Sequence, residues 1–311
     1  MNHRCLQTAE RDMDAPPEMV SGVLPAVVSI QATIRPRHPS TMVLGEERMG
    51  TGVIVDTGGY LLTVNYVVLG AEYLGVSLAD GRRFQARLVA QDFDSGLAVL
   101  RIPPQDLPAV RLGSSMDLLP GQPVFLLAAT GTVERRLAEG FITYLGEFDT
   151  HWEYMLDKII GVTIQNPGFG GAPLFDSVGR VVGIASLNLS EVARATVAIP
   201  VELYQLNRTE LLEFGRVASR AEKAWVGAYF QPVEQGVLVA GLVPGGPAEA
   251  AGIREGDVIL AVDYCTVETR RDLYEELWKK RAKEKVVFKI LREEQVTAVE
   301  VVSGSREEFY Q

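Results

Sequence analysis

The sequence is poor in the residues that build disulfides, metal sites and imidazole chemistry. It has two cysteines, Cys5 and Cys265, and three histidines, His3, His38 and His151. Two cysteines this far apart cannot form a disulfide framework, so we expect two reduced thiols. No two histidines have the spacing of metal ligands, and we expect each of them on the solvated surface. The sequence therefore predicts no metal site and no cofactor.

The chain also lacks an excess of positive charge and an uninterrupted apolar run. It has 30 Lys and Arg against 40 Asp and Glu, and this net charge of −10 argues against a nucleic-acid partner. The uncharged run 118–133 is broken by prolines and glycines, so we expect no membrane insertion. Residues 1–20 contain no apolar core of a secretory signal. We therefore expect a cytoplasmic protein for the chain as given, and a periplasmic one if its N-terminus has been trimmed.

Glycine and proline are abundant, with 30 and 16 residues. Short runs rich in β-branched residues alternate with turn residues, a pattern typical of an all-β barrel or sandwich. The first convincing helix is predicted over 201–214, where Gly215 can end it. The predicted strands are 25–30, 52–55, 60–63, 76–78, 84–89 and 97–102.

Five stretches follow one another at ordinary spacings. They read Leu-Pro-Ala-Val-Val-Ser-Ile at 24–30, Gly-Thr-Gly-Val-Ile-Val at 50–55, Gly-Tyr-Leu-Leu-Thr-Val-Asn-Tyr-Val-Val at 59–68, Asp-Phe-Asp-Ser-Gly-Leu-Ala-Val-Leu at 92–100, and Asn-Pro-Gly-Phe-Gly-Gly-Ala-Pro-Leu at 166–174. Together they resemble the HtrA/Deg-type trypsin-like serine proteases. The resemblance implies a mostly-β fold, a trypsin/chymotrypsin-like double β-barrel.

Three of these stretches carry the catalytic triad in that family. The mechanism needs a hydroxyl nucleophile, an imidazole base and a carboxylate that orients the imidazole. At the matching positions this sequence has Tyr66 for the imidazole, Gly96 for the carboxylate and Gly170 for the hydroxyl. Tyrosine, with a free pKa near ~10, is a poor base at neutral pH, and glycine has no side chain to offer. The resemblance thus predicts a degenerate triad and a pseudoprotease that is not an enzyme.

The former oxyanion and specificity loop comprises Gly168, Phe169 and Gly170. Phe169 replaces a small polar residue of the family pattern. Its ring either fills the vacant substrate pocket or packs locally, and the sequence favours neither interpretation.

A second unit follows, with Val-Pro-Gly-Gly-Pro-Ala-Glu-Ala-Ala-Gly-Ile-Arg-Glu-Gly-Asp-Val-Ile at 243–259. This stretch resembles the PDZ domain of HtrA-type proteins, an α+β fold of five to six strands and two helices. The resemblance implies that backbone N–H groups beside Val226, Gly227 and Ala228 receive a C-terminal carboxylate. Tyr229 either lines the groove or faces solvent. Leu273 and Leu277, four apart on a predicted helix, either form the opposite wall or are core residues.

These patterns predict a domain organisation and a function. We expect a bacterial, non-catalytic HtrA-like protein that binds protein or peptide C-termini as a scaffold, adaptor or chaperone in protein quality control. Two alternatives stay open: a serine endopeptidase with a non-standard or residual active site, and a structural subunit of a larger complex. The oligomeric state is open between monomer, trimer and subunit of a hetero-complex. The predicted segments are a flexible N-terminus (1–17), the barrel domain (18–207), a helix end and linker (208–224), the PDZ domain (225–303) and a tail (304–311).

Overall fold

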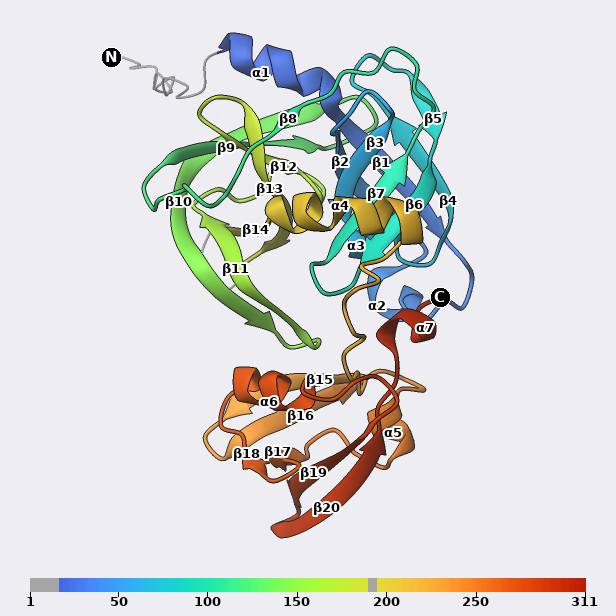
Figure 1. Ribbon diagram of the computed structural model, residues 1–311, viewed down its shortest axis with the longest axis vertical. Coiled ribbons are helices and arrows are strands. Elements are labelled where there is room, and N and C mark those ends of the chain that lie inside the picture. Colours follow the sequence, from blue (N-terminus) through green and yellow to red (C-terminus); the bar gives the residue numbers. More distant parts are fainter. Residues whose placement is uncertain (1–16, 190–194) are drawn as a thin grey trace, which may run out of the picture.

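The computed structural model describes residues 17–189 and 195–311. Two seven-stranded sheets form one body, and a six-stranded sheet forms a second body below it in Figure 1. This arrangement confirms the predicted mostly-β fold, a double barrel followed by a smaller α+β domain. The predicted flexible segment, His3 and Cys5 lie outside the described residues, apart from Pro17.

The first sheet is built from strands that are buried on nearly every residue. Leu61, Leu62 and Val64 are fully buried, as is the run from Leu97 to Leu100 that pairs with them. Such continuous apolar runs indicate strands covered on both faces. The strand order is β5-β4-β1-β2-β3-β7-β6. The strands are β1 (Val27–Ile34), β2 (Glu47–Ile54), β3 (Tyr60–Val64), β4 (Ala71–Ser77), β5 (Arg83–Gln85), β6 (Arg87–Asp92) and β7 (Leu97–Arg101).

The second sheet closes on itself. Its order is β12-β9-β10-β11-β14-β13-β8, and β12 also pairs with β13, so six strands form a ring and β8 lies beside it. The hairpin of β10 and β11 is long, and it extends from the barrel toward the second body (Figure 1). The strands are β8 (Arg111–Leu112), β9 (Pro123–Ala129), β10 (Arg135–Thr150), β11 (Tyr154–Val162), β12 (Pro173–Asp176), β13 (Arg180–Asn188) and β14 (Thr196–Pro200).

Helices are few and short around the barrels. The predicted helix is confirmed as α4 (Glu202–Phe214), and Gly215 ends it with φ +76° while its N–H donates to the Leu211 carbonyl. Across the described ranges, 17–189 and 195–311, no helix is both long and apolar enough to cross a bilayer. The other helices of this body are α1 (Pro17–Val23), the 3₁₀ turn η1 (Leu24–Ala26), α2 (Thr41–Leu44) and α3 (Asn65–Val68).

The second domain wraps one sheet around its own apolar core. Phe230, Phe288 and Tyr274 are fully buried there. Thr269 begins α6 with a reciprocal cap, because its hydroxyl accepts from the Asp272 amide while the Asp272 carboxylate accepts from the Thr269 amide. The elements are β15 (Ala228–Val233), β16 (Gly236–Leu242), α5 (Pro247–Ala250), β17 (Val258–Val262), β18 (Cys265–Thr266), α6 (Arg270–Leu277), β19 (Lys285–Arg292) and β20 (Gln295–Val302).

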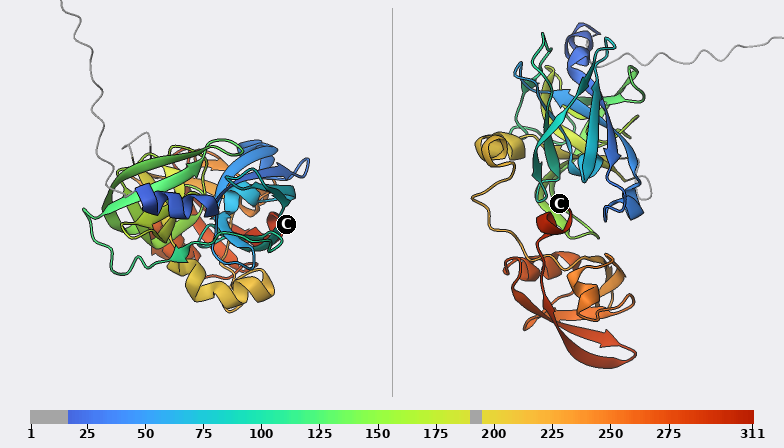
Figure 2. Two further views of the ribbon diagram at one scale, coloured as in Figure 1. Left: turned by 90° about the horizontal axis from the view of Figure 1, so that it is seen from above. Right: turned by 90° about the vertical axis from the view of Figure 1, so that its right-hand side faces the viewer.

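The last helix, α7 (Arg306–Phe309), lies between the two domains in Figure 1 and in the right view of Figure 2. The rings of Phe309 and Tyr310 pack against Trp225, with centroids 4.7 and 5.9 Å away. His38 Nε2 donates a hydrogen bond to the Tyr310 carbonyl oxygen over 2.8 Å. The predicted polar tail is therefore a contact between the domains. The expectation of a solvated His38 is wrong, because only 6% of this residue is exposed.

Candidate functional site

The loop at 166–171 lies where the two barrels meet. Three backbone hydrogen bonds hold it: Thr51 N to Gly170 O at 2.8 Å, Gly171 N to Ala185 O at 2.8 Å, and Phe169 N to Ala129 O at 3.0 Å. Thr51 belongs to the first sheet, whereas Ala129 and Ala185 belong to the second. The loop is thus fixed by both barrels at once.

Two glycines of the loop are required by this tight contact. A Cβ at Gly168 would lie 2.3 Å from the Ala129 carbonyl oxygen, and one at Gly171 would lie 2.1 Å from that of Thr51. Gly171 also has φ +92°, a conformation that residues with a side chain rarely adopt. The Gly168 amide donates to Asn166 Oδ1 over 3.2 Å. The loop backbone is therefore constrained by close contacts that require glycine at positions 168 and 171.

Tyr66 and Gly170, two of the predicted triad positions, lie in direct contact. The Tyr66 hydroxyl donates to the Ser186 carbonyl oxygen over 2.8 Å, and a Cβ at position 170 would lie 1.8 Å from the same hydroxyl oxygen. Burial raises the pKa of Tyr66 to about 12, so the phenol stays protonated at neutral pH. Because the phenol fills the space beside Gly170, a side chain does not fit there unless Tyr66 moves.

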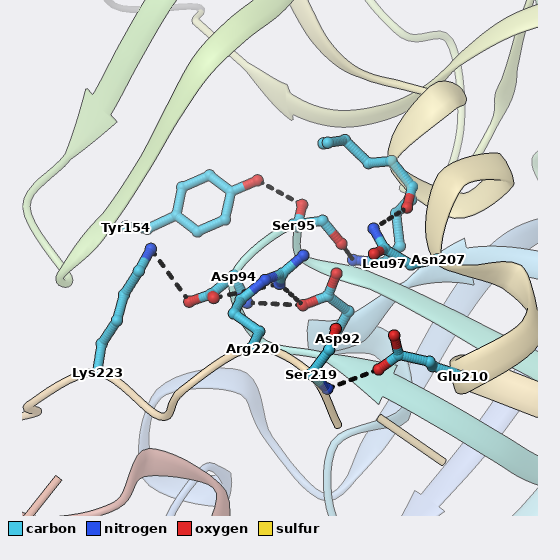
Figure 3. Close-up of polar contacts among 11 residues, drawn as sticks. Asp92, Asp94, Ser95, Leu97, Tyr154, Asn207, Glu210, Ser219, Arg220 and Lys223 are labelled. Carbon is cyan, nitrogen blue, oxygen red and sulfur yellow. Dashed lines mark hydrogen bonds and ion pairs between the residues drawn. The ribbon is translucent and has the colours of Figure 1, made fainter. Parts of the chain in front are cut away.

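Gly96, the third predicted triad position, adjoins the same short helix. Its carbonyl oxygen accepts from the Asn65 amide over 2.7 Å, next to Tyr66 on α3. Its φ of +76° favours glycine, and a Cβ here would lie 3.1 Å from the Tyr154 hydroxyl. That hydroxyl donates to the Ser95 carbonyl oxygen over 2.7 Å (Figure 3). The structure thus brings all three predicted positions into one region, with a tyrosine beside each of the two glycines.

Phe169 has a partly exposed side chain, and its backbone supports the loop. Its carbonyl oxygen accepts from Thr51 Oγ1 at 2.8 Å and from Asn166 Nδ2 at 3.2 Å. Nothing in these contacts distinguishes a ring that fills a former pocket from one that packs locally. The role of the Phe169 ring stays a prediction.

An ion cluster beside Gly96 fixes the predicted linker to the first barrel. Arg220 donates to Asp92 Oδ1 over 2.8 Å and to Asp94 Oδ2 over 3.1 Å, and Lys223 Nζ lies 3.5 Å from Asp94 Oδ1 (Figure 3). The Asp94 carboxylate, which neighbours the predicted triad position, is therefore paired with two cations. Among residues 17–189 and 195–311, no group of three His, Cys, Asp or Glu side chains could hold a metal ion.

The predicted carboxylate-binding loop of the second domain has a carboxylate bound to it. Glu153, from the turn between β10 and β11, accepts from the amides of Val226, Gly227 and Ala228 at 3.1, 2.7 and 3.1 Å. Gly227 has φ +72°, which lets successive N–H groups converge. Burial raises the pKa of Glu153, against the opposing effects of Arg306 and the three amides. Sequence reasoning missed Glu153, because a glutamate in a hairpin turn carries no distinguishing signal.

The other predicted groove residues differ in how deeply they are buried. Tyr229 is half-buried, with its ring centroid 5.8 Å from that of His151 in the same turn. Leu273 and Leu277 are fully buried among the core residues of the domain. Between them on α6, Tyr274 contacts the turn, because its hydroxyl donates to the Thr150 carbonyl oxygen over 2.6 Å. The role of the predicted residues in binding a peptide stays a prediction.

Two family profiles match the chain in this order. One, described as a trypsin-like peptidase domain, matches residues 50–184, and one described as a PDZ domain matches residues 224–302. The chain carries an HtrA/DegP-type trypsin-like peptidase domain and a PDZ domain. In this chain, the loop at 166–171 lies at the junction of the two barrels, and the loop at 226–228 that binds the Glu153 carboxylate lies at the start of the PDZ match.

Relatives of the chain are named "Probable periplasmic serine endoprotease DegP-like". The one from Halomonas elongata is 32% identical over 286 residues, covering 86% of this chain and 59% of its own length. The one from Marinomonas sp. is 31% identical over 273 residues, covering 83% of this chain and 57% of its own length. The chain thus spans slightly more than half the length of the curated relatives it matches.

Solved structures agree with the fold. The HtrA-type protease AlgW with a decapeptide is 28% identical, with a TM-score of 0.57, covering 93% of this chain and 98% of that protein. The serine endoprotease from Yersinia pestis, at 24% identity and a TM-score of 0.56, is similar in fold alone.

Two sequence-based expectations are corrected by these comparisons. The prediction that the protein is not an enzyme is contradicted, because the relatives are named serine endoproteases. The prediction of a cytoplasmic location is contradicted as well, because the same relatives are named periplasmic.

Proposed function

We propose that the protein is a periplasmic HtrA-type serine endopeptidase with a non-standard or residual active site, which recognises polypeptides through its PDZ domain. The names of the relatives support the activity and the compartment. The PDZ match, and the solved AlgW structure with a decapeptide, support peptide recognition. Because this chain spans only part of the length of its relatives, we propose, rather than transfer from them, the activity and substrates of the whole protein.

One observation carries the recognition part of this proposal. Three successive amides, at Val226, Gly227 and Ala228, converge on a single carboxylate group. Backbone amides arranged in this way are the means by which peptide-recognition domains receive a C-terminal carboxylate. The described geometry is therefore suited to a polypeptide end, and the wall formed by β15 offers main-chain pairing beside it.

We call the active site non-standard or residual because of the residues at the three positions of the catalytic triad. Tyr66, Gly96 and Gly170 provide neither an imidazole base nor a hydroxyl nucleophile of ordinary reactivity. Loss of the nucleophile alone lowers kcat of a serine protease by a factor on the order of 10⁶, while binding and oxyanion stabilisation retain about 10³ to 10⁴ over water. We therefore propose slow hydrolysis by groups other than an intact triad.

A proteolysis assay tests the enzymatic part. The protein and its Halomonas elongata relative are incubated with the same unfolded protein substrate, and products are identified by mass spectrometry. We expect cleavage slower than that of the relative by a factor on the order of 10⁶, and about 10³ to 10⁴ faster than in buffer alone. A fluorophosphonate probe marks contaminating serine proteases by their different masses. Cleavage no faster than in buffer, or activity that follows a contaminant, contradicts the proposed endopeptidase.

Scaffold, adaptor or chaperone action through the PDZ domain is a second candidate. The convergent amides at 226–228 favour it, since peptide binding needs no triad. Prevention of aggregation of an unfolded reporter protein, measured by light scattering at equimolar protein, tests this candidate. We expect suppression that a free C-terminal peptide diminishes, and an unchanged rate of aggregation contradicts it.

A further inference from the structure

The groove between β15 and α6 is filled by the turn that joins β10 to β11. The Phe230 amide on β15 donates to the His151 carbonyl oxygen over 2.8 Å, on one side of the turn. On the other side, the Tyr274 hydroxyl of α6 donates to the Thr150 carbonyl oxygen at 2.6 Å and accepts from the Glu153 amide at 2.9 Å. Both walls of the groove therefore bind the backbone of residues 150–153, which we call the hairpin tip.

The side chain of Glu153 occupies the carboxylate position at the end of this groove. Its Oε1 accepts from Gly227 and Ala228, its Oε2 accepts from Val226, and only 1% of the residue is exposed. A peptide C-terminus would present the same chemical group, two carboxylate oxygens, to the same three donors. One site cannot accept both groups, so the two are mutually exclusive.

The backbone of the hairpin tip also resembles a bound strand in its main-chain contact. Pairing of an extended peptide with a sheet edge is how such grooves gain affinity, and the Phe230–His151 hydrogen bond is of this kind. Glu153 itself has φ +54°, a left-handed conformation that is strained for a residue with a side chain. This strain persists because the surrounding contacts over-determine the conformation.

Charged contacts hold the hairpin tip and the β10 residues just before it. Arg270, at the start of α6, binds the Asp149 carboxylate and donates to the Asp149 carbonyl oxygen, and Arg271 pairs with Glu147 at 2.9 Å. Arg306 of α7 donates to the Glu153 carbonyl oxygen. Met155, the residue after Tyr154, packs against the PDZ core. The tip is thus bound by the PDZ groove and by the segment that follows the PDZ domain.

We propose that Glu153 is an internal ligand of the PDZ carboxylate site, and that a polypeptide with a free C-terminus binds only by displacing it together with the hairpin tip. This inference rests on the proposed peptide recognition and assigns to it a competitor within the same chain. Because the competitor is tethered, its effective concentration does not fall on dilution. A groove that is open for about 1 to 10% of the time weakens the apparent affinity of an external peptide by about 10- to 100-fold.

Peptide titration of the full chain tests the competition. The probe is a pool of acetylated tetrapeptides with an apolar last residue, used as free acids and as C-terminal amides, and binding is measured by calorimetry. We expect Glu153→Ala to bind the free acids about tenfold or more tightly than the unsubstituted protein, and to leave the amides unbound. Glu255→Ala, which removes an exposed acid of the same domain, is the matched control and should change nothing.

Tyr274→Phe provides a second variant that keeps the ring in the core. It removes two hydrogen bonds to the hairpin tip, so we expect an intermediate gain in affinity even where Glu153→Ala does not fold. Equal affinities of the unsubstituted protein and of the folded variants would overturn the internal-ligand inference, while leaving peptide recognition intact.

Hydrogen exchange separates this inference from the proposed function. In the folded Glu153→Ala variant, we expect the amides of Val226, Gly227 and Ala228 to lose protection. If these amides remain protected, the internal-ligand inference is wrong whatever the peptides do. If they are released and no free-acid peptide binds, the internal ligand stands and the proposed peptide recognition is wrong.

Discussion

At the scale of single residues, Tyr66 and Gly170 depend on each other. The family pattern was sufficient to predict both positions, because the motifs around 59–68 and 166–174 fix their register. It was insufficient to predict their contact, because the position of the phenol depends on packing between two barrels and on the Ser186 carbonyl. The buried phenol explains why a residue without a side chain occupies position 170.

Substitution of Gly170 tests this dependence. Gly170→Ser places a Cβ 1.8 Å from the Tyr66 hydroxyl oxygen, so Tyr66 has to leave its buried position. We expect a loss of about 1–3 kcal/mol in the free energy of unfolding, the usual cost of overpacking. Urea denaturation followed by circular dichroism measures it.

A double-mutant cycle is the control for this contact. In a Tyr66→Ala background the clash is absent, so Gly170→Ser should cost much less than in the unsubstituted protein. Strictly additive losses would show that the two residues do not interact.

At the scale of elements, the strands followed from the sequence and the hairpin tip did not. Alternation, β-branched runs and glycine turns predicted β3 and β7 to within one residue of their observed bounds, whereas β1 begins two residues later and ends four residues later than predicted. The binding of Glu153 to the amides at 226–228 joins segments that are distant in sequence, and no local pattern at 149–153 indicates it. Local propensity determines strands, whereas contacts between elements depend on the whole fold.

An ion pair between strands predicts acid sensitivity of the PDZ domain. Asp257, just before β17, accepts two hydrogen bonds of 2.6 Å from Arg292 at the end of β19. Burial of Asp257 opposes its ionisation, but the bonds from Arg292 and the Arg254 amide outweigh this and hold its pKa below the usual value. Because the pKa is lowered on folding, the stabilisation is complete above about pH 4, the unfolded value, and is lost as pH falls through the folded value.

Unfolding by urea at a series of pH values from about 2 to 6 measures this effect. We expect Asp257→Asn to be less stable near neutral pH and to show a weaker decline on acidification. Parallel stability curves for the two proteins across this range would contradict the assigned role.

At the scale of the whole molecule, three sets of contacts among the described residues hold the PDZ domain and its flanking segments against the barrel domain. They are the hairpin tip in the PDZ groove, the ion cluster of Arg220 with Asp92 and Asp94, and the packing of α7 against the first barrel. We propose the predicted boundaries, with a barrel domain at 18–207 and a PDZ domain at 225–303. The segments 208–224 and 304–311 then act as connections that are held against the barrel.

Removal of residues 309–311 tests the contribution of the last contact. It deletes two half-buried aromatic rings and the Tyr310 carbonyl that accepts from His38. We expect a loss on the order of 2 kcal/mol in unfolding free energy and greater separation of the domains in small-angle scattering. Phe214→Ala removes an exposed aromatic of α4 and should stay within about 0.5 kcal/mol. An unchanged scattering profile of the shortened protein would show that the other two contacts suffice.

All three tryptophans of the chain lie at the junction of the domains. Trp152 belongs to the hairpin tip, Trp225 packs against α7, and Trp278 stacks on Tyr274 at 4.9 Å. Lys223 Nζ lies 4.5 Å from the centroid of the Trp278 ring. Apart from Trp152 at the hairpin tip, the barrel domain has no tryptophan, so its core is silent when indole emission is excited selectively. Intrinsic fluorescence of the unlabelled protein is therefore an optical readout of whether the junction is open or closed.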